Sequence, residues 1–179
     1  GWCRQMGRDP REIPLIRESL RLWRSIDARI EGETGFRQCG IIYLCETDAE
    51  LQAREKWYEE NARPFGLSTR LVTGVEAEAL QPGSTRKWRG ALYTEDDGRA
   101  EPFMAAPAIA AGARRKGAKI ITGCAVRGLE TSGGRVSAIV TERGPIACDS
   151  AVLAGGAWSR RFCHNLGIAL PQLTVINSV

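Results

Sequence analysis

Hydrophobic residues in the first thirty positions follow the spacing of an amphipathic helix. Apolar side chains recur every three or four residues, while arginine and glutamate occupy the opposite face. Asp9 is followed by Pro10 and, three residues on, by Glu12, so the pattern predicts a helix that begins directly after Asp9 and runs to about Ile30. Asp27 is a charge on the apolar side. The apolar stripe comprises Ile13, Ile16, Leu20, Trp23 and Ile30.

Strand-like runs alternate with two capped helices in the next segment. Residues 36–45 have the apolar composition of a strand, and residues 68–72 are a shorter strand candidate. Thr47 with Glu50 forms a capping-box pattern that predicts a helix to about residue 62. Thr73 with Glu76 repeats this pattern before a brief helix that stops near Pro82 and Gly83.

The second half begins with a helix and continues as a series of strands. Residues 91–93 are a strand fragment, residues 95–98 a solvated turn, and residues 102–117 an alanine-rich helix with a basic end. Glycine-containing turns then separate short β-rich runs, which predicts a short strand feeding a β-meander. The predicted strands are residues 119–122, 125–131, 135–141 and 145–148.

An uninterrupted apolar run at residues 151–154 predicts a buried strand, and Gly155-Gly156 then leads into a short helix to about residue 166. In an open α/β sheet, ligands bind where a strand turns into a helix at its carboxyl end. Adjacent glycines would let a ligand approach the backbone without meeting a Cβ atom. Taken without further context, an ordinary tight strand-to-helix turn is the simpler interpretation.

Composition excludes several kinds of site. The chain has 179 residues, of which 43% are hydrophobic and 26% charged, which is typical of a packed protein with one domain's worth of residues. A net charge of +4, spread along the chain, gives no support for a nucleic-acid partner.

One histidine, His164, and six cysteines without a C-x-x-C pair argue against a metal site or a Ser-His-Asp triad. With no apolar run long enough to span a membrane, a reduced, cytoplasmic location is expected.

Nucleotide and calcium motifs are missing as well. Neither G-x-G-x-x-G nor the P-loop pattern occurs, although 20 glycines are more than average. The acidic cluster at residues 95–97 lacks the alternating spacing of an EF-hand. The basic clusters at residues 114–116 and 160–161 are interpreted as solvated helix ends.

Read in order, these segments resemble a family of FAD-dependent oxidoreductases that includes glycine oxidase, D-amino acid oxidase, sarcosine oxidase and D-amino acid dehydrogenase. Ala154-Gly155-Gly156-Ala157-Trp158-Ser159 is similar to the family's usual Ala-Gly-Ala-Trp-Ser, except that Gly155 is followed by Gly156 rather than by alanine. The start at residues 1–5, the turn at residues 97–102 and the run at residues 119–126 also follow the family pattern.

The resemblance implies a mixed α/β (α+β) fold, in which part of an FAD-binding Rossmann-like lobe with a β-meander accompanies part of an antiparallel substrate-domain sheet with helices. Residues 1–34 would be the helical part of the FAD lobe and 35–93 part of the substrate-binding domain. Residues 94–168 would be the second segment of the FAD lobe, and 169–179 the start of the return to the substrate domain. The G-x-G-x-x-G unit of the family is not in these residues, so the chain is expected to be a central fragment, itself inactive.

The resemblance also implies a cofactor and where it binds. The backbone of Ala125 and Val126 would lie against the adenine of FAD, and Ala154, Gly155 and Gly156 would approach the dinucleotide. Trp158 would pack beside the site, and Arg4 would be near the isoalloxazine. These residues are Arg4, Ala125, Val126, Ala154, Gly155, Gly156 and Trp158.

The implied activity is hydride transfer from an amine or amino acid, of the glycine, sarcosine or D-amino acid type, onto the flavin. The sequence assigns no catalytic residue and leaves the electron acceptor open between oxygen and a respiratory or peripheral-membrane partner. The oligomeric state stays open too. The alternative function is a non-catalytic interaction or regulatory module derived from the same fold.

Overall fold

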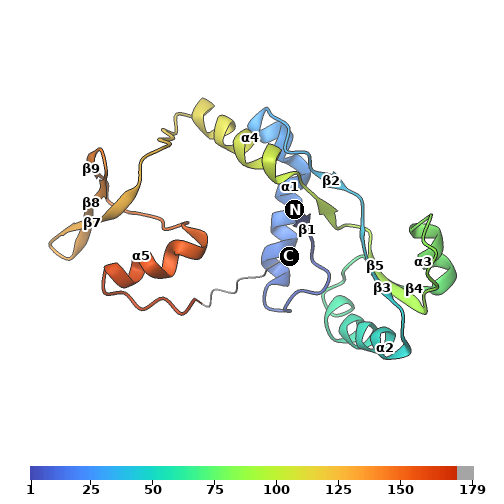
Figure 1. Cartoon of the computed structure of the whole chain (residues 1–179). Helices are drawn as coiled ribbons and strands as arrows, with labels where there is room; N and C mark the ends of the chain where they lie inside the picture. The colour runs from blue at the N-terminus through green and yellow to red at the C-terminus, as the bar shows by residue number, and fades with distance from the viewer. Residues whose placement is uncertain (173–179) are drawn as a thin grey trace. The chain divides into compact units, whose positions relative to one another are not determined.

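The computed structural model describes residues 1–172 and divides the chain into two compact units. Unit 1 is Gly1–Lys119, and unit 2 begins at Ile120. Figure 1 shows their elements along the chain. Among the described residues, unit 1 has two small antiparallel sheets and unit 2 has one, each unit with helices beside them, which confirms the predicted mixed α/β class.

Helix α1 spans Ile13–Ile30 and buries Ile13 and Leu20, as the apolar stripe predicts. Its predicted start directly after Asp9 is wrong. The Asp9 carboxylate accepts hydrogen bonds from the backbone N–H of Arg11 at 2.9 Å and from its guanidinium at 2.7 Å, which holds residues 9–12 in a turn. Asp27, the charge on the apolar side, accepts from the Thr34 backbone at 3.0 Å and from its hydroxyl at 2.6 Å, so it closes the turn that follows the helix.

Helix α4, Pro102–Arg115, packs against α1 at a close approach of the two backbones. A Cβ atom at Gly112 would lie 2.7 Å from the Cβ of Ile30. Glycine is therefore required there by packing, although it is a poor helix former.

A small sheet ties the start of the chain to its middle. Its strands are β1 (Trp2–Cys3), β6 (Gly98–Arg99) and β2 (Arg37–Gln38), with β6 in the centre and both pairings antiparallel. The continuous strand predicted for residues 36–45 is wrong, because Gly40, at φ 70°, separates β2 from β3. A side chain at Gly40 would lie 2.6 Å from Cε2 of Tyr93.

The second sheet of unit 1 has the order β3-β5-β4, with strands Ile41–Cys45, Gly90–Thr94 and Thr69–Thr73. Helix α2, Asp48–Trp57, continues as a π-helical turn over Tyr58–Ala62, and α3 spans Gly74–Leu80. Both predicted capping boxes are present, at Thr47 and at Thr73. Val72, Ala77 and Ala91 form the buried core between sheet and helices.

Unit 2 contains the predicted β-meander. Its strands are β7 (Val126–Ser132), β8 (Arg135–Thr141) and β9 (Gly144–Ala147), paired in that order. A 3₁₀ turn at Gly156–Trp158 leads into α5, Ser159–Asn165, where the short helix is predicted.

Two predicted strands, residues 119–122 and 151–154, are not formed in the described part of the chain. The run at 151–154 is also not buried, since Val152 is 94% exposed and Leu153 42% exposed. A strand needs a neighbour whose backbone completes its hydrogen bonds, and no described strand pairs with either segment. Of the predicted return segment, residues 173–179 lie outside the described residues. No helix in residues 1–172 is both long and apolar enough to cross a membrane.

The central strand β6 gives a test of the close packing of unit 1. A Cβ atom at Gly98 would collide with the carbonyl oxygen of Arg37 and lie 3.1 Å from the Cα of Gln38. We expect Gly98→Ala to destabilise unit 1 by about 2 kcal/mol, because backbone atoms must shift. Urea unfolding of wild type and variant measures the difference.

Gly32→Ala is the matched control, because the nearest atoms to its Cβ would lie at 3.7 Å, an ordinary contact. Its effect should stay within about 0.5 kcal/mol. Equal effects of the two substitutions would contradict the packing account.

Candidate functional site

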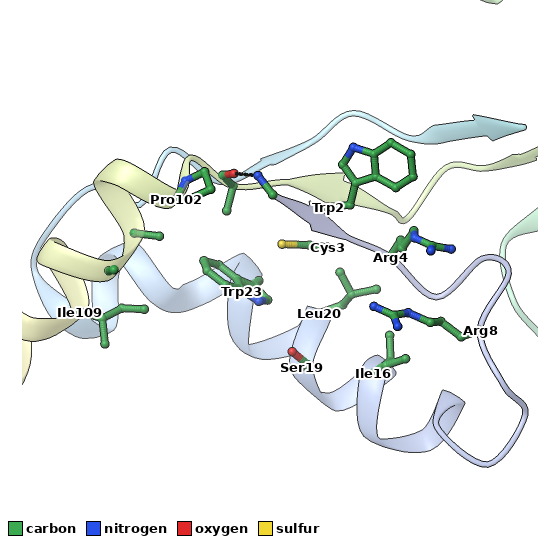
Figure 2. A pocket seen from close by; sticks show the side chains of 14 residues that line it. Trp2, Cys3, Arg4, Arg8, Ile16, Ser19, Leu20, Trp23, Pro102 and Ile109 are labelled. Carbon is green, nitrogen blue, oxygen red and sulfur yellow. Dashed lines mark hydrogen bonds between the residues drawn. The ribbon is translucent and has the colours of Figure 1, made fainter. Parts of the chain in front are cut away.

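A pocket of about 450 Å³ in unit 1 has an apolar lining from two helices. Ile16, Leu20 and Trp23 come from α1, and Ile109 comes from α4. Figure 2 shows these side chains, with Trp2, Cys3, Arg4 and Arg8 along the segment that crosses above α1. A mostly apolar cavity with a few charged groups is the usual form of a small-molecule site.

Asp97 fixes the loop that carries Arg4. Its side chain is fully buried, and its carboxylate accepts hydrogen bonds from the backbone N–H of Gln5 at 2.8 Å and of Met6 at 3.2 Å. Its backbone carbonyl accepts from Cys39 and Gly40 at 3.3 and 2.9 Å. One residue therefore joins three segments that are distant in the sequence.

The solvated turn predicted for residues 95–98 is therefore wrong at Asp97. Its carboxylate binds backbone groups more than ninety residues earlier in the chain. The residues next to Asp97 in the sequence do not indicate such a contact, and no other pattern in the sequence pointed to it.

Burial raises the pKa of Asp97 from 3.8 to about 6. The two backbone N–H groups and the nearby Arg4 oppose this rise in pKa, while Asp96 adds to it. Burial also raises the pKa of the neighbouring Cys3 thiol, which favours the neutral form over a reactive thiolate.

A second pocket, of about 440 Å³, lies in unit 2 and is lined by uncharged residues of the meander and of the segment after it. It brings together four of the predicted site residues: Val126, Ala154, Gly155 and Trp158. Leu129, Ile139 and Phe162 also line it and were not predicted.

The other predicted residues do not line this pocket. Ala125 directly precedes β7, and its carbonyl accepts from the backbone N–H of Glu142 at 3.1 Å. Gly156 adopts φ 54° and its carbonyl accepts from the Gln172 side chain at 3.0 Å. Arg4 belongs to unit 1 and lines the pocket there.

The family model described as FAD dependent oxidoreductase matches residues 1–178. The chain belongs to this family. A D-amino acid dehydrogenase from Bradyrhizobium diazoefficiens is 33% identical over 170 residues, covering 92% of this chain and 40% of that protein. The structure of an L-amino acid deaminase from Proteus myxofaciens is 34% identical, with a TM-score of 0.89 over 95% of this chain and 39% of that one.

A glycine oxidase from Geobacillus kaustophilus, at 24% identity and a TM-score of 0.83, shares the fold. Together with the deaminase it confirms that the units have the architecture of FAD-dependent amino acid oxidases. The chain spans about two fifths of the length of the dehydrogenase and of the deaminase.

The pocket of unit 2 fits one part of the family's cofactor. Its lining carries no charged side chain, and Ala154 and Gly155 are small residues of that lining. Such a surface suits a flat, uncharged ring such as adenine, and does not suit a pyrophosphate, which needs cations or converging N–H donors.

The raised pKa of Asp97 predicts a pH-dependent stability. A carboxyl group whose folded pKa exceeds its unfolded value stabilises the fold below about pH 4, and this contribution is lost as pH rises through about 6. Relative to Asp97→Asn, wild type should therefore lose up to about 3 kcal/mol between pH 4 and pH 7. Urea unfolding at a series of pH values measures this difference.

Asp48→Asn is the control, because the Asp48 side chain is 73% exposed and Asp48 is not among the groups that shift the pKa of Asp97. Its difference from wild type should vary little over the same range. A constant difference between wild type and Asp97→Asn would contradict the assignment.

Proposed function

We propose that these residues are the central part of an FAD-dependent oxidoreductase that oxidises an amine or an amino acid. The family match over residues 1–178 carries this proposal. Relatives named D-amino acid dehydrogenase and D-amino-acid oxidase support the substrate class.

In this proposal the pocket of unit 2 holds the adenine end of FAD. The backbone of Ala125 and Val126 lies against the adenine, and Trp158 packs beside the site. Ala154, Gly155 and Gly156 approach the dinucleotide. Four of these residues line the pocket: Val126, Ala154, Gly155 and Trp158. The apolar lining excludes water from this end of the cofactor.

Arg4 is proposed to lie near the isoalloxazine, on the loop that Asp97 holds in place. Residues 1–34 and 94–168 then belong to the FAD lobe, residues 35–93 to the substrate-binding domain, and 169–179 lead back to it. Bound FAD supplies the chemistry, because it accepts a hydride from the carbon next to the amine nitrogen. The residues of this chain bind FAD, orient it and shield it from water. On their own they are proposed to be inactive, since the dinucleotide-binding glycine motif is not among them.

Two strand residues of similar exposure test the placement of the adenine. Val126, on β7, is 47% exposed and lines the pocket, whereas Ile146, on β9, is 43% exposed and does not. In the longer protein proposed to contain this chain, Val126→Asp should lower FAD affinity at least about tenfold, because a charge would replace apolar contact. Ile146→Asp should leave the affinity unchanged. Bound flavin is measured by absorbance after gel filtration.

Equal flavin content in both variants would contradict the placement. A folded longer protein that is colourless even with added FAD would contradict the proposed function itself. It would then favour the alternative, an interaction module without catalysis.

A further inference from the structure

A further cavity of unit 1, of about 460 Å³, lies on the polar face of α1. Three arginines line it, and because they are spaced by four and then three residues they share one face of the helix. We call this cavity the arginine pocket. Its polar lining comprises Gln5, Arg17, Glu18, Arg21, Arg24 and Asp96.

Two of the arginines are held in place by carboxylates of the same lining. Arg21 donates to Glu18 through Nε at 2.7 Å and through Nη2 at 2.6 Å. Arg24 donates through Nε to the Gln38 side chain at 3.0 Å, and its Nη2 lies 3.2 Å from the Asp96 carboxylate. A guanidinium carries five N–H donors, so each of these contacts fixes the side chain and leaves further donors free.

Arg17 is the charge of the pocket that no carboxylate balances. Its Nη1 donates to the carbonyl of Phe65 at 3.0 Å, and within residues 1–172 no carboxylate oxygen lies within 4 Å of it. Three arginines against two carboxylates leave the lining with a net positive charge. Free donors and this charge together favour an anion with several acceptor oxygens.

Gln5 adds a polar group without a partner. The residue is only 4% exposed, and its backbone is bound by Asp97 and by Arg8. Its side-chain amide makes no hydrogen bond to any of the described residues. The amide is not sealed off, however, because in that part of the chain the polar side-chain atoms that lack both a partner and accessible surface are Arg54 Nε and Trp88 Nε1.

A nearly buried amide that keeps accessible surface beside a cavity indicates a ligand atom within that cavity, since buried polar groups are otherwise paired. Its NH₂ group can donate to the same anion as the arginines. The donors then come from two segments of the chain, the loop that carries Gln5 and the helix α1.

We propose that the arginine pocket binds the phosphate group of a small phosphorylated compound. Guanidinium groups form charge-assisted hydrogen bonds with phosphate oxygens. Donors from two segments suit a tetrahedral anion better than a planar carboxylate. The cavity lies within the range of roughly 300–1,000 Å³ found for small-molecule sites, so an organic group fits beside the phosphate, against Pro14 and Leu20.

The test uses the full chain without FAD, so its outcome does not depend on the proposed function. Glycerol 1-phosphate is the probe, at about 0.1 M salt to screen long-range attraction. We expect saturable NMR shifts of the Gln5 side-chain NH₂ and of the Nε–H groups of Arg17, Arg21 and Arg24. Arg17→Gln and, separately, Arg21→Gln should each weaken binding about tenfold, the loss of one charge-assisted contact.

Arg11→Gln is the matched control. Like Arg21, Arg11 is exposed and donates through two nitrogens to one carboxylate, that of Asp9 at 2.9 and 2.7 Å, but it does not line the pocket. The variant carries the same change of charge and should bind the probe as wild type does. Because Arg17 and Arg21 are exposed as well, an unchanged backbone amide spectrum is expected and separates lost binding from unfolding.

Two further ligands define the selectivity. Acetate should bind at least about tenfold more weakly than glycerol 1-phosphate, because a carboxylate has fewer acceptor oxygens and a single charge. Inorganic phosphate should also bind more weakly, because it makes no contact with Pro14 and Leu20. Equal affinity for inorganic phosphate would overturn the assignment of an organic compound.

Three results would overturn the site itself. These are no saturable shift in wild type, equal weakening by Arg11→Gln and Arg21→Gln, or acetate binding as tight as that of glycerol 1-phosphate. A longer protein that stays colourless with FAD would contradict the proposed function and would leave the arginine pocket unaffected.

Discussion

The hydrogen bonds from the amides of Gln5 and Met6 to the buried Asp97 carboxylate are the constraint that joins the N-terminal loop of unit 1 to the rest of the unit. They join the start of the chain to the turn before β6, and the carbonyl of the same residue fixes the break between β2 and β3. The two sheets of unit 1 meet at this residue. A buried carboxyl group in such a position is costly when charged, which is why its pKa rises in spite of the donors.

These hydrogen bonds also position the Arg4 side chain. Arg4 is adjacent to the clamped amides, lines the apolar pocket and lies between the rings of Trp2 and Tyr43. The loop that Asp97 holds in place thus contributes Arg4 to the lining of the apolar pocket. The pocket of unit 2, in contrast, is lined by uncharged residues of the meander and of the segment after it.

The sequence was sufficient to predict features that depend on interactions between residues close together in the chain. The capping boxes at Thr47 and Thr73, the apolar stripe of α1 and the glycine turns of the meander all depend on residues within a few positions of one another. They were predicted correctly. The family resemblance, carried by the stretch around Trp158, is confirmed by the match over residues 1–178.

The predictions that proved wrong have a common cause. In each case the structure of the segment depends on contacts that its own sequence pattern does not show. The apolar run at residues 151–154 resembles a buried strand, yet burial and pairing require neighbouring strands that the run itself cannot provide. Asp97 resembles a turn residue, and only its contacts with Gln5 and Met6 make it a core residue. Asp9 has the composition of a helix cap, but its carboxylate binds Arg11 instead.

Hydrogen exchange at the amides of Gln5 and Met6 tests the central role of Asp97 most directly. The account predicts strong protection of both amides in wild type and in Asp96→Ala, and fast exchange of both in Asp97→Ala while the amides of the β3-β5-β4 sheet stay protected. Unchanged protection of Gln5 and Met6 in Asp97→Ala would contradict it, because the loop would then be held by other contacts.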